Sequence, residues 1–135
     1  MELSDASRVL AGILCLSLVT VETGGALMFR IVQGRQPATP IQQSFFRAGH
    51  AHAGVYLILG LVAQVLVDAT TLTGPAEWVA RTFVPIAALL LPGGFFLSVS
   101  RPGATEPNRL VALVPAGAVV LAIGLATLGI GLLAA

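Results

Sequence analysis

Four long apolar runs alternate with short polar segments along the chain. The runs cover residues 9–29, 48–67, 82–100 and 110–135, and they are continuous, without the alternation of a half-buried strand. About 20 apolar residues in a helix cross the hydrocarbon of a bilayer, so each run is long enough for one span. The pattern predicts a single all-α domain over residues 1–135, an integral membrane four-helix bundle.

Turn and capping residues indicate where three of the helices begin. Thr39 and Gln42 have the spacing of a capping box, and Pro40 between them suits the first helical position. We therefore expect the second helix to begin near Pro40, before the membrane-spanning part. Residues 74–77 and 105–108 have a similar composition and predict the starts of the third and fourth helices.

Composition supports a membrane protein and excludes other classes. The chain is 56% hydrophobic and 10% charged, whereas a soluble domain carries about 25% charged residues. Its formal net charge of +1 gives no basic patch, so nucleic acid is not an expected partner. The single cysteine, Cys15, cannot form an internal disulfide.

The arginines are divided unequally between the two ends of the predicted bundle. Those next to the first and third connections are Arg30, Arg35, Arg47, Arg101 and Arg109, whereas the other end has Arg8 and Arg81. By the positive-inside rule, the first and third connections lie in the cytoplasm and both termini lie outside. We expect a multi-pass protein of a bacterial cell membrane, with the lipid bilayer as its surroundings.

Small residues recur with a regular spacing in the last run. The two sets are Gly117, Gly124 and Gly131, seven residues apart, and Ala118, Ala122 and Ala126, four residues apart. Stripes of small residues allow membrane helices to approach closely. The sequence leaves open whether this packing is within one protomer or between subunits.

Ionisable side chains inside the predicted spans are few, and they are Glu22, His50 and His52, with Tyr56 as a polar companion. Such groups are costly in a bilayer and usually mark a site. Counted from the nearest arginines, Glu22 and Tyr56 lie at similar depths of roughly 12 and 14 Å. We expect Glu22 to face the bundle interior, within hydrogen-bond reach of Tyr56 or His52. A purely structural role for a protonated Glu22 is the alternative.

The two histidines differ in their surroundings. They are two residues apart, so on a helix they point about 200° apart and cannot bind one ion together. Beside His50, Ala53 and Gly54 leave a shallow surface on which a flat macrocycle can lie, whereas His52 is followed one turn later by Tyr56. This pattern favours His50 as the metal ligand, and a hydrogen-bonded packing histidine is the alternative.

Residues 47–54, which read Arg-Ala-Gly-His-Ala-His-Ala-Gly, resemble the start of the second helix in the styrene oxide isomerase and hydroxylaminobenzene mutase group. These are small four-helix membrane isomerases. Residues 94–97, Gly-Phe-Phe-Leu, followed by Ser-Arg-Pro, resemble a Gly-Phe-Tyr-Leu stretch and a Ser-Pro turn of the same group. In the isomerase, the corresponding histidine is the axial ligand of a haem b held between subunits of a trimer. The resemblance therefore implies haem b as cofactor, His50 as its ligand and a homo-oligomer, a trimer.

Three positions depart from the isomerase pattern. Tyr56 stands where the isomerase has Asn, Phe96 where it has its active-site Tyr, and Ala88 where it has an acidic residue. The haem ligand is thus kept while the substrate-handling groups are not, which leaves Tyr56, His52 and Glu22 to move protons. His52-Ala-Gly also matches a His-Ser-Gly of the isomerase, so His52 remains the alternative ligand.

Two functions follow. The leading one is an isomerase-like enzyme that binds haem b and uses ferric iron as a Lewis acid on a small apolar molecule entering from the lipid. The alternative is a non-catalytic accessory protein or small subunit of a larger membrane complex, which the loss of the polar pocket residues favours. A transporter ranks third, because the two halves show no repeat.

Overall fold

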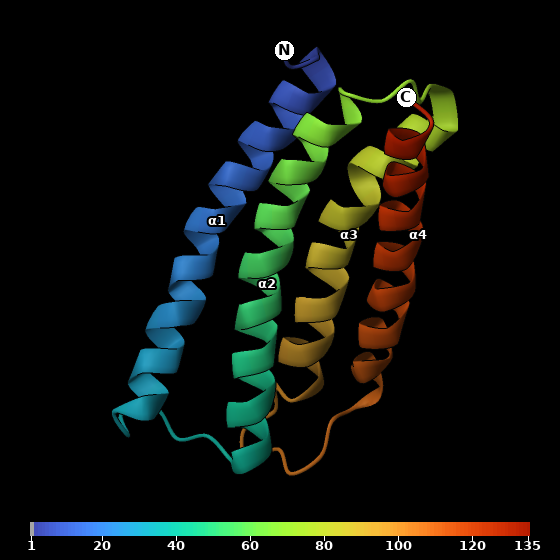
Figure 1. Cartoon of the computed structure of the whole chain (residues 1–135). Helices are drawn as coiled ribbons and strands as arrows, with labels where there is room; N and C mark the ends of the chain where they lie inside the picture. Colours follow the sequence, from blue (N-terminus) through green and yellow to red (C-terminus); the bar gives the residue numbers. More distant parts are fainter. Residues whose placement is uncertain (1) are drawn as a thin grey trace.

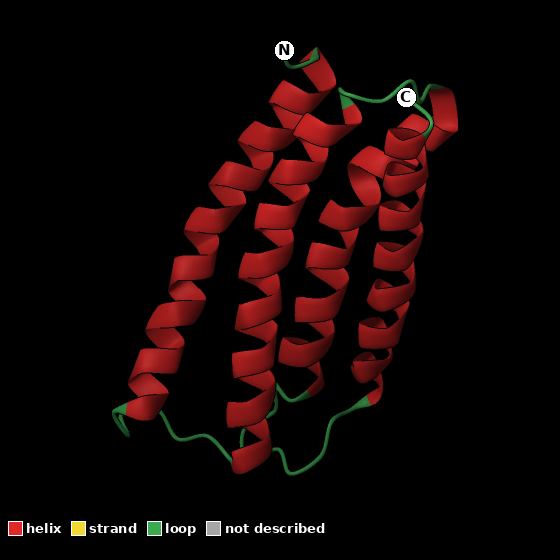
Figure 2. Cartoon of the chain, viewed as in Figure 1, coloured by secondary structure: helices red, strands yellow, loops and turns green. Residues whose placement is uncertain are grey.

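The computed structural model describes residues 2–135, which form four antiparallel helices (Figure 1). The elements are α1 (Asp5–Val32), α2 (Pro40–Val67), α3 (Gly74–Ser98), the short 3₁₀ helix η1 (Arg109–Ala112) and α4 (Leu113–Leu133). Figure 2 shows helices and loops only, without a strand among the described residues. All four long helices have the length and apolar composition to cross a membrane, so the predicted all-α four-helix membrane bundle is confirmed.

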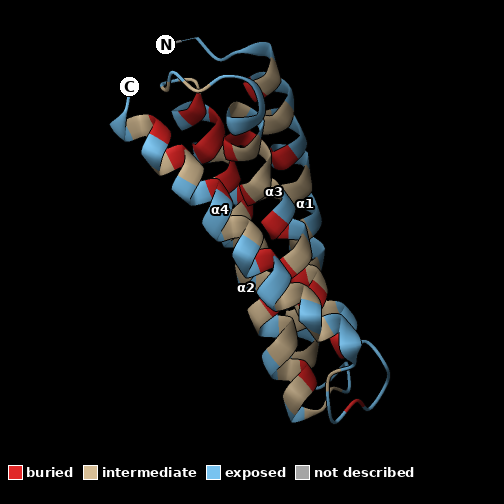
Figure 3. Cartoon of the chain, turned by 90° about the vertical axis from the view of Figure 1, so that its right-hand side faces the viewer, coloured by how far each residue is buried: buried red, intermediate tan, exposed pale blue. Residues whose placement is uncertain are grey.

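Helices that follow one another in the chain also pack against one another. α1 packs mainly against α2, α2 against α3, and α3 against α4. The buried residues gather toward the end of the bundle that holds both termini (Figure 3). The apolar core there includes Ala63 and Val67 of α2, Ala80 and Val84 of α3, and Leu128 of α4. α1 is therefore the least enclosed helix, and its other faces are open to the surroundings.

The predicted capping box forms at the start of α2. The backbone N–H of Gln42 donates to Oγ1 of Thr39 over 3.3 Å, and the backbone N–H of Thr39 donates to Oε1 of Gln42 over 3.0 Å. Nε2 of Gln42 also donates to the carbonyls of Val99 and Arg101, over 3.0 Å each. The cap of one helix thus fastens the connection before α2 to the connection after α3.

The predicted start of the third helix is confirmed, whereas the fourth helix begins after the predicted residues 105–108. α3 begins at Gly74, which has a φ of +61°, a conformation that favours glycine. The fourth helical segment begins at Arg109, with Asn108 as its N-cap. The helices extend beyond the predicted spans, since α1 begins at Asp5 and α2 at Pro40. The extra turns lie at the ends, where polar residues can reach water.

Two glycines of α4, Gly117 and Gly124, lie against α3, and Gly131 lies against Leu72 in the connection before α3. Gly117, Gly124 and Gly131 are all buried. A Cβ added to Gly124 would lie 2.7 Å from Cβ of Phe83 on α3, too close for a real contact. The alanines of the second stripe, Ala118, Ala122 and Ala126, are exposed. Of the two alternatives for the glycine stripe, packing within one protomer is therefore the one that the structure shows.

Candidate functional site

His50 and His52 lie on different sides of α2, in agreement with the 200° expected from their spacing. The imidazole of His50 lies against two consecutive glycines of α1. A Cβ added to Gly24 would be 3.0 Å from Nδ1 of His50, and one added to Gly25 would be 3.7 Å from Nε2. The ring thus occupies space that larger side chains on α1 would fill.

His50 also lines a groove of about 320 Å³. Its walls come from three helices, with Thr20, Gly24 and Leu27 on α1, Ala53 on α2 and Phe96 on α3 among the lining residues. Gly54 does not line the groove, and nothing lies within 4 Å of the position that its Cβ would take. No lining residue is an aspartate, glutamate, arginine or lysine, so the groove suits an apolar molecule.

Neither ring nitrogen of His50 has a hydrogen-bond partner within residues 2–135, and the side chain is half-buried. The hydroxyls of Thr20 and Thr23 bond to carbonyls of their own helix, over 2.6 Å each, and so leave the groove weakly polar. A free imidazole beside an apolar surface is a nitrogen ligand available to a metal. The alternative of a hydrogen-bonded packing histidine therefore does not describe His50 among the described residues.

His52 has a different environment. Its Nδ1 lies 2.7 Å from the carbonyl oxygen of Ala48, one turn earlier. Only an N–H can bond to a carbonyl oxygen, so Nδ1 of His52 carries a proton and donates to Ala48. The ring packs between Tyr56 and Phe95, with centroid distances of 5.4 and 5.1 Å. His52 is thus positioned as a packed and oriented imidazole that does not line the groove.

The expected pairing of Glu22 with Tyr56 or His52 is wrong. The side chain of Glu22 is exposed and forms no hydrogen bond or ion pair with the described part of the chain. The reason is angular: Leu14, Leu18 and Val21 form the apolar contact with α2, and Glu22 is rotated past that face. Tyr56 instead joins this apolar contact. A similar depth in the membrane therefore did not bring the side chains of Glu22 and Tyr56 together.

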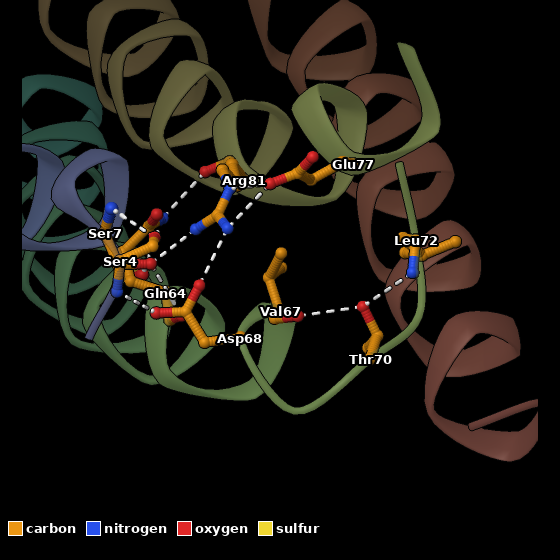
Figure 4. Close-up of polar contacts among 10 residues, drawn as sticks. Ser4, Ser7, Gln64, Val67, Asp68, Thr70, Leu72, Glu77 and Arg81 are labelled. Carbon is orange, nitrogen blue, oxygen red and sulfur yellow. Dashed lines mark hydrogen bonds and ion pairs between the residues drawn. The ribbon is translucent and has the colours of Figure 1, made fainter. Parts of the chain in front are cut away.

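A buried charged cluster at the terminal end of the bundle was not predicted (Figure 4). Arg81 of α3 is 3% exposed. Its Nη2 donates to Oδ1 of Asp68 over 2.7 Å and to Oε1 of Glu77 over 2.8 Å, and its Nη1 donates to the hydroxyl of Ser7 on α1. The sequence interpretation counted Arg81 as a loop charge. Glu77, four residues earlier on the same helix, was the available signal for a paired arginine.

Serines of α1 and Gln64 of α2 complete this cluster. The hydroxyl of Ser7 donates to the carbonyl of Gln64 over 3.0 Å, and Nε2 of Gln64 donates to the carbonyl of Arg81 over 2.8 Å. The backbone N–H of Ser4 donates to Oδ2 of Asp68 over 2.9 Å. Burial alone would raise the pKa of Asp68, but the hydrogen bonds from Arg81 and the serines lower it to about 2. The cluster joins α1, α2 and α3 and has the character of a structural anchor.

Comparisons of the chain with models of protein families, with curated proteins and with solved structures gave no match. The function is therefore argued from the groove at His50 and the short motifs around it.

Proposed function

We propose that this protein binds haem b with His50 as the axial ligand. The observation that supports this most directly is the imidazole of His50, which has no hydrogen-bond partner in the described part of the chain and faces a groove without carboxylate, arginine or lysine side chains. Gly24 and Gly25 make room for the ring itself on α1, and Leu27, Ala53 and Phe96 supply apolar surface. One nitrogen ligand beside apolar walls is the donor set that a haem requires.

The residues of the groove define what the chain itself would do in an isomerase-like reaction. His50 would hold the cofactor, and Leu27, Ala53 and Phe96 would exclude water and orient a small apolar substrate arriving from the lipid. When bound, ferric haem would supply a Lewis acid for a substrate oxygen. Proton transfer by Tyr56, His52 or Glu22 would need a rearrangement or a second chain, since none of the three lines the groove of the protomer.

That last observation favours the second candidate function, a non-catalytic accessory protein or small subunit of a larger membrane complex. Apart from His50, no ionisable side chain lines the groove. A protein that only stores or presents a haem has no need of such a group. An accessory protein of this kind either binds haem without turning over a substrate or binds no haem at all.

A homo-oligomer, a trimer by the resemblance, belongs to the same proposal. Glu22 is exposed on the membrane-spanning helix α1, where a carboxylate facing lipid costs about 2.5–3.5 kcal/mol on translocon scales. A second copy covering this side of α1 would remove Glu22 from the lipid. The open groove at His50 would then be completed by the neighbouring protomer.

The orientation in a bacterial cell membrane is also proposed, with both termini outside. The five arginines near the first and third connections are exposed and have no ion-pair partner among residues 2–135. At the other end, Arg81 pairs with Asp68 and Glu77, and Arg8 pairs with Asp5. The positive-inside rule counts arginines and lysines whether or not they are paired, so the support for this orientation is the excess of arginines at the first and third connections.

Absorption spectroscopy on the purified protein tests the haem site. After supplementation with haem in detergent, the wild type should show a Soret band. His50→Ala should abolish the band, and His52→Ala should retain it, perturbed at most in position. Loss of the Soret band in His52→Ala and not in His50→Ala would assign the ligand to His52. Its Nδ1 bonds to a backbone carbonyl, as is common among metal-binding histidines. No band in the wild type would refute the proposal.

A further inference from the structure

A second hollow lies between the His50 groove and the end of the bundle that holds the first and third connections. It has a volume of about 370 Å³. Gln36 comes from the connection before α2, Ser100 and Pro102 come from the connection after α3, and Phe46 comes from the first turns of α2. Leu27 of α1 lines both this hollow and the groove, so the two spaces share a wall.

Two phenylalanines that stack on each other line one space each. Phe46 lines the outer hollow and Phe96 lines the groove. Their rings are stacked, with centroids 5.7 Å apart and planes 23° from parallel. Phe46 precedes His50 by about one turn of α2. A molecule that moves from the outer hollow past Phe46 along the helix therefore reaches His50.

The two rings are held differently. A Cβ added to Gly49 would lie 2.8 Å from Cε2 of Phe96, so Phe96 is pressed against the backbone of α2. Phe46 is half-buried and borders an open hollow, where a side chain changes rotamer readily. Phe96 is therefore the fixed ring of the stacked pair, and Phe46 is the ring that can move.

The chemistry of the lining limits what can enter. Neither space is lined by an aspartate, glutamate, lysine or arginine. The amide of Gln36 is exposed and unpaired within residues 2–135, and the hydroxyl of Ser100 donates to the carbonyl of Leu97 but keeps its lone pairs. The amide of Gln42, by contrast, is engaged with Thr39, Val99 and Arg101. The outer hollow thus offers hydrogen bonds without charge.

We propose that the two hollows form one path from the connection end of the bundle to His50, closed by Phe46. The outer hollow binds a small, uncharged molecule with a hydrogen-bonding group, and movement of Phe46 admits it to the apolar groove. The path supplements entry from the lipid and deepens the proposed function, because it leads to the proposed ligand. It does not depend on a bound haem.

Thiol labelling tests the path in the haem-free protein. The background is Cys15→Ser with Ala53→Cys, which places the only thiol in the groove, and the protein is reconstituted in liposomes. The two probes are N-(2-hydroxyethyl)maleimide, which is hydrophilic and uncharged, and N-phenylmaleimide, which enters through lipid. Adding Phe46→Ala should accelerate the hydrophilic probe about threefold or more and leave the lipophilic probe unchanged.

Phe45→Ala is the matched control. Phe45 is the adjacent residue, packs edge-on against Phe95 at 5.6 Å and does not line either space. It should leave both labelling rates unchanged. Equal acceleration by the two alanine variants, equal acceleration of the two probes, or no acceleration by Phe46→Ala would overturn the proposal.

A second variant covers the case in which Phe46→Ala does not fold. Ser100→Trp fills the outer hollow from an exposed loop position. It should slow the hydrophilic probe several-fold without affecting the lipophilic one, and an unchanged rate would refute the path. A missing Soret band would refute the haem proposal alone, so the two failures are distinguishable.

Discussion

Nη2 of Arg81 on α3 lies 2.7 Å from Oδ1 of Asp68 at the end of α2, and the two side chains are only 4% and 6% exposed. An ion pair buried to this degree depends on both members, because removing one leaves an uncompensated charge in a poorly hydrated place. Ser7 of α1 bonds to the same guanidinium. The pair therefore controls how three helices are joined at this end of the bundle.

Arg81→Leu should lower the free energy of unfolding by about 3–5 kcal/mol, the usual cost of breaking a buried pair. The double variant Arg81→Leu with Asp68→Asn should show a smaller decrease in the free energy of unfolding, because it leaves no buried unpaired carboxylate at position 68. Reversible unfolding in mixed micelles measures both. Arg8→Leu, which removes an exposed pair with Asp5, is the control and should change stability little. Equal losses for Arg8→Leu and Arg81→Leu would contradict the structural role of the cluster.

The stability of the fold should also depend on pH through the carboxyl group of Asp68. Its pKa is about 2 in the folded protein, below the ordinary value of 3.8. As the pH falls through this interval, the unfolded state takes up the proton first, so the stabilisation present above pH 3.8 is lost toward pH 2. The thermal midpoint followed by circular dichroism should fall over this range. Asp68→Asn should remove that part of the decline, and an unaltered decline would assign it to other carboxyl groups.

The sequence predicted those features that depend on one helix at a time. Apolar runs determine the four helices, and Thr39 and Gln42 determine a cap by local spacing alone. The separation of His50 and His52 follows from helical geometry in the same way. Features that depend on the packing of two helices were harder to predict from the sequence. That Gly24 and Gly25 of α1 face His50 depends on how α1 is rotated against α2.

Glu22 and Arg81 show why residue counting fails at such contacts. Counting from the membrane surface gave Glu22 a depth but no direction, and the apolar face around Val21 turned it outward. Arg81 was assigned to a loop, although its partner Ser7 lies 74 positions away in the chain. Only the packed arrangement brings such residues together.

The glycine stripe of α4 gives a prediction about the contact with α3. Gly124→Leu should destabilise the protomer by about 1–3 kcal/mol or more, because the added side chain meets Phe83 in a packed interface. Ala122→Leu adds comparable bulk to an exposed position of the same helix and should leave the unfolding free energy nearly unchanged. Native mass spectrometry of Ala122→Leu also reports whether the alanine stripe contacts another subunit. Wild-type stability of Gly124→Leu would contradict the close approach of α3 and α4.

The last prediction concerns the space that α1 leaves for His50. Gly24→Val should displace the imidazole, because even the first added carbon lies 3.0 Å from Nδ1. If His50 binds haem, the dissociation constant should rise roughly tenfold or more, which corresponds to about 1.4 kcal/mol. Gly12→Val is the matched control on the same helix, with nothing within 4 Å of the added Cβ. It carries the same β-branched residue and hence the same helix-propensity cost.

Nuclear magnetic resonance of ¹⁵N-labelled histidine follows the displacement without haem. The signals of His50 should shift in Gly24→Val and stay in place in Gly12→Val, while those of His52, bonded to Ala48, should move in neither. Unshifted His50 signals in Gly24→Val would contradict the contact between α1 and the imidazole. If the His50 signals shift but haem binding is undiminished, the contact with α1 is supported and His50 is not the haem ligand. A ligand displaced by a valine cannot hold the iron with unchanged affinity.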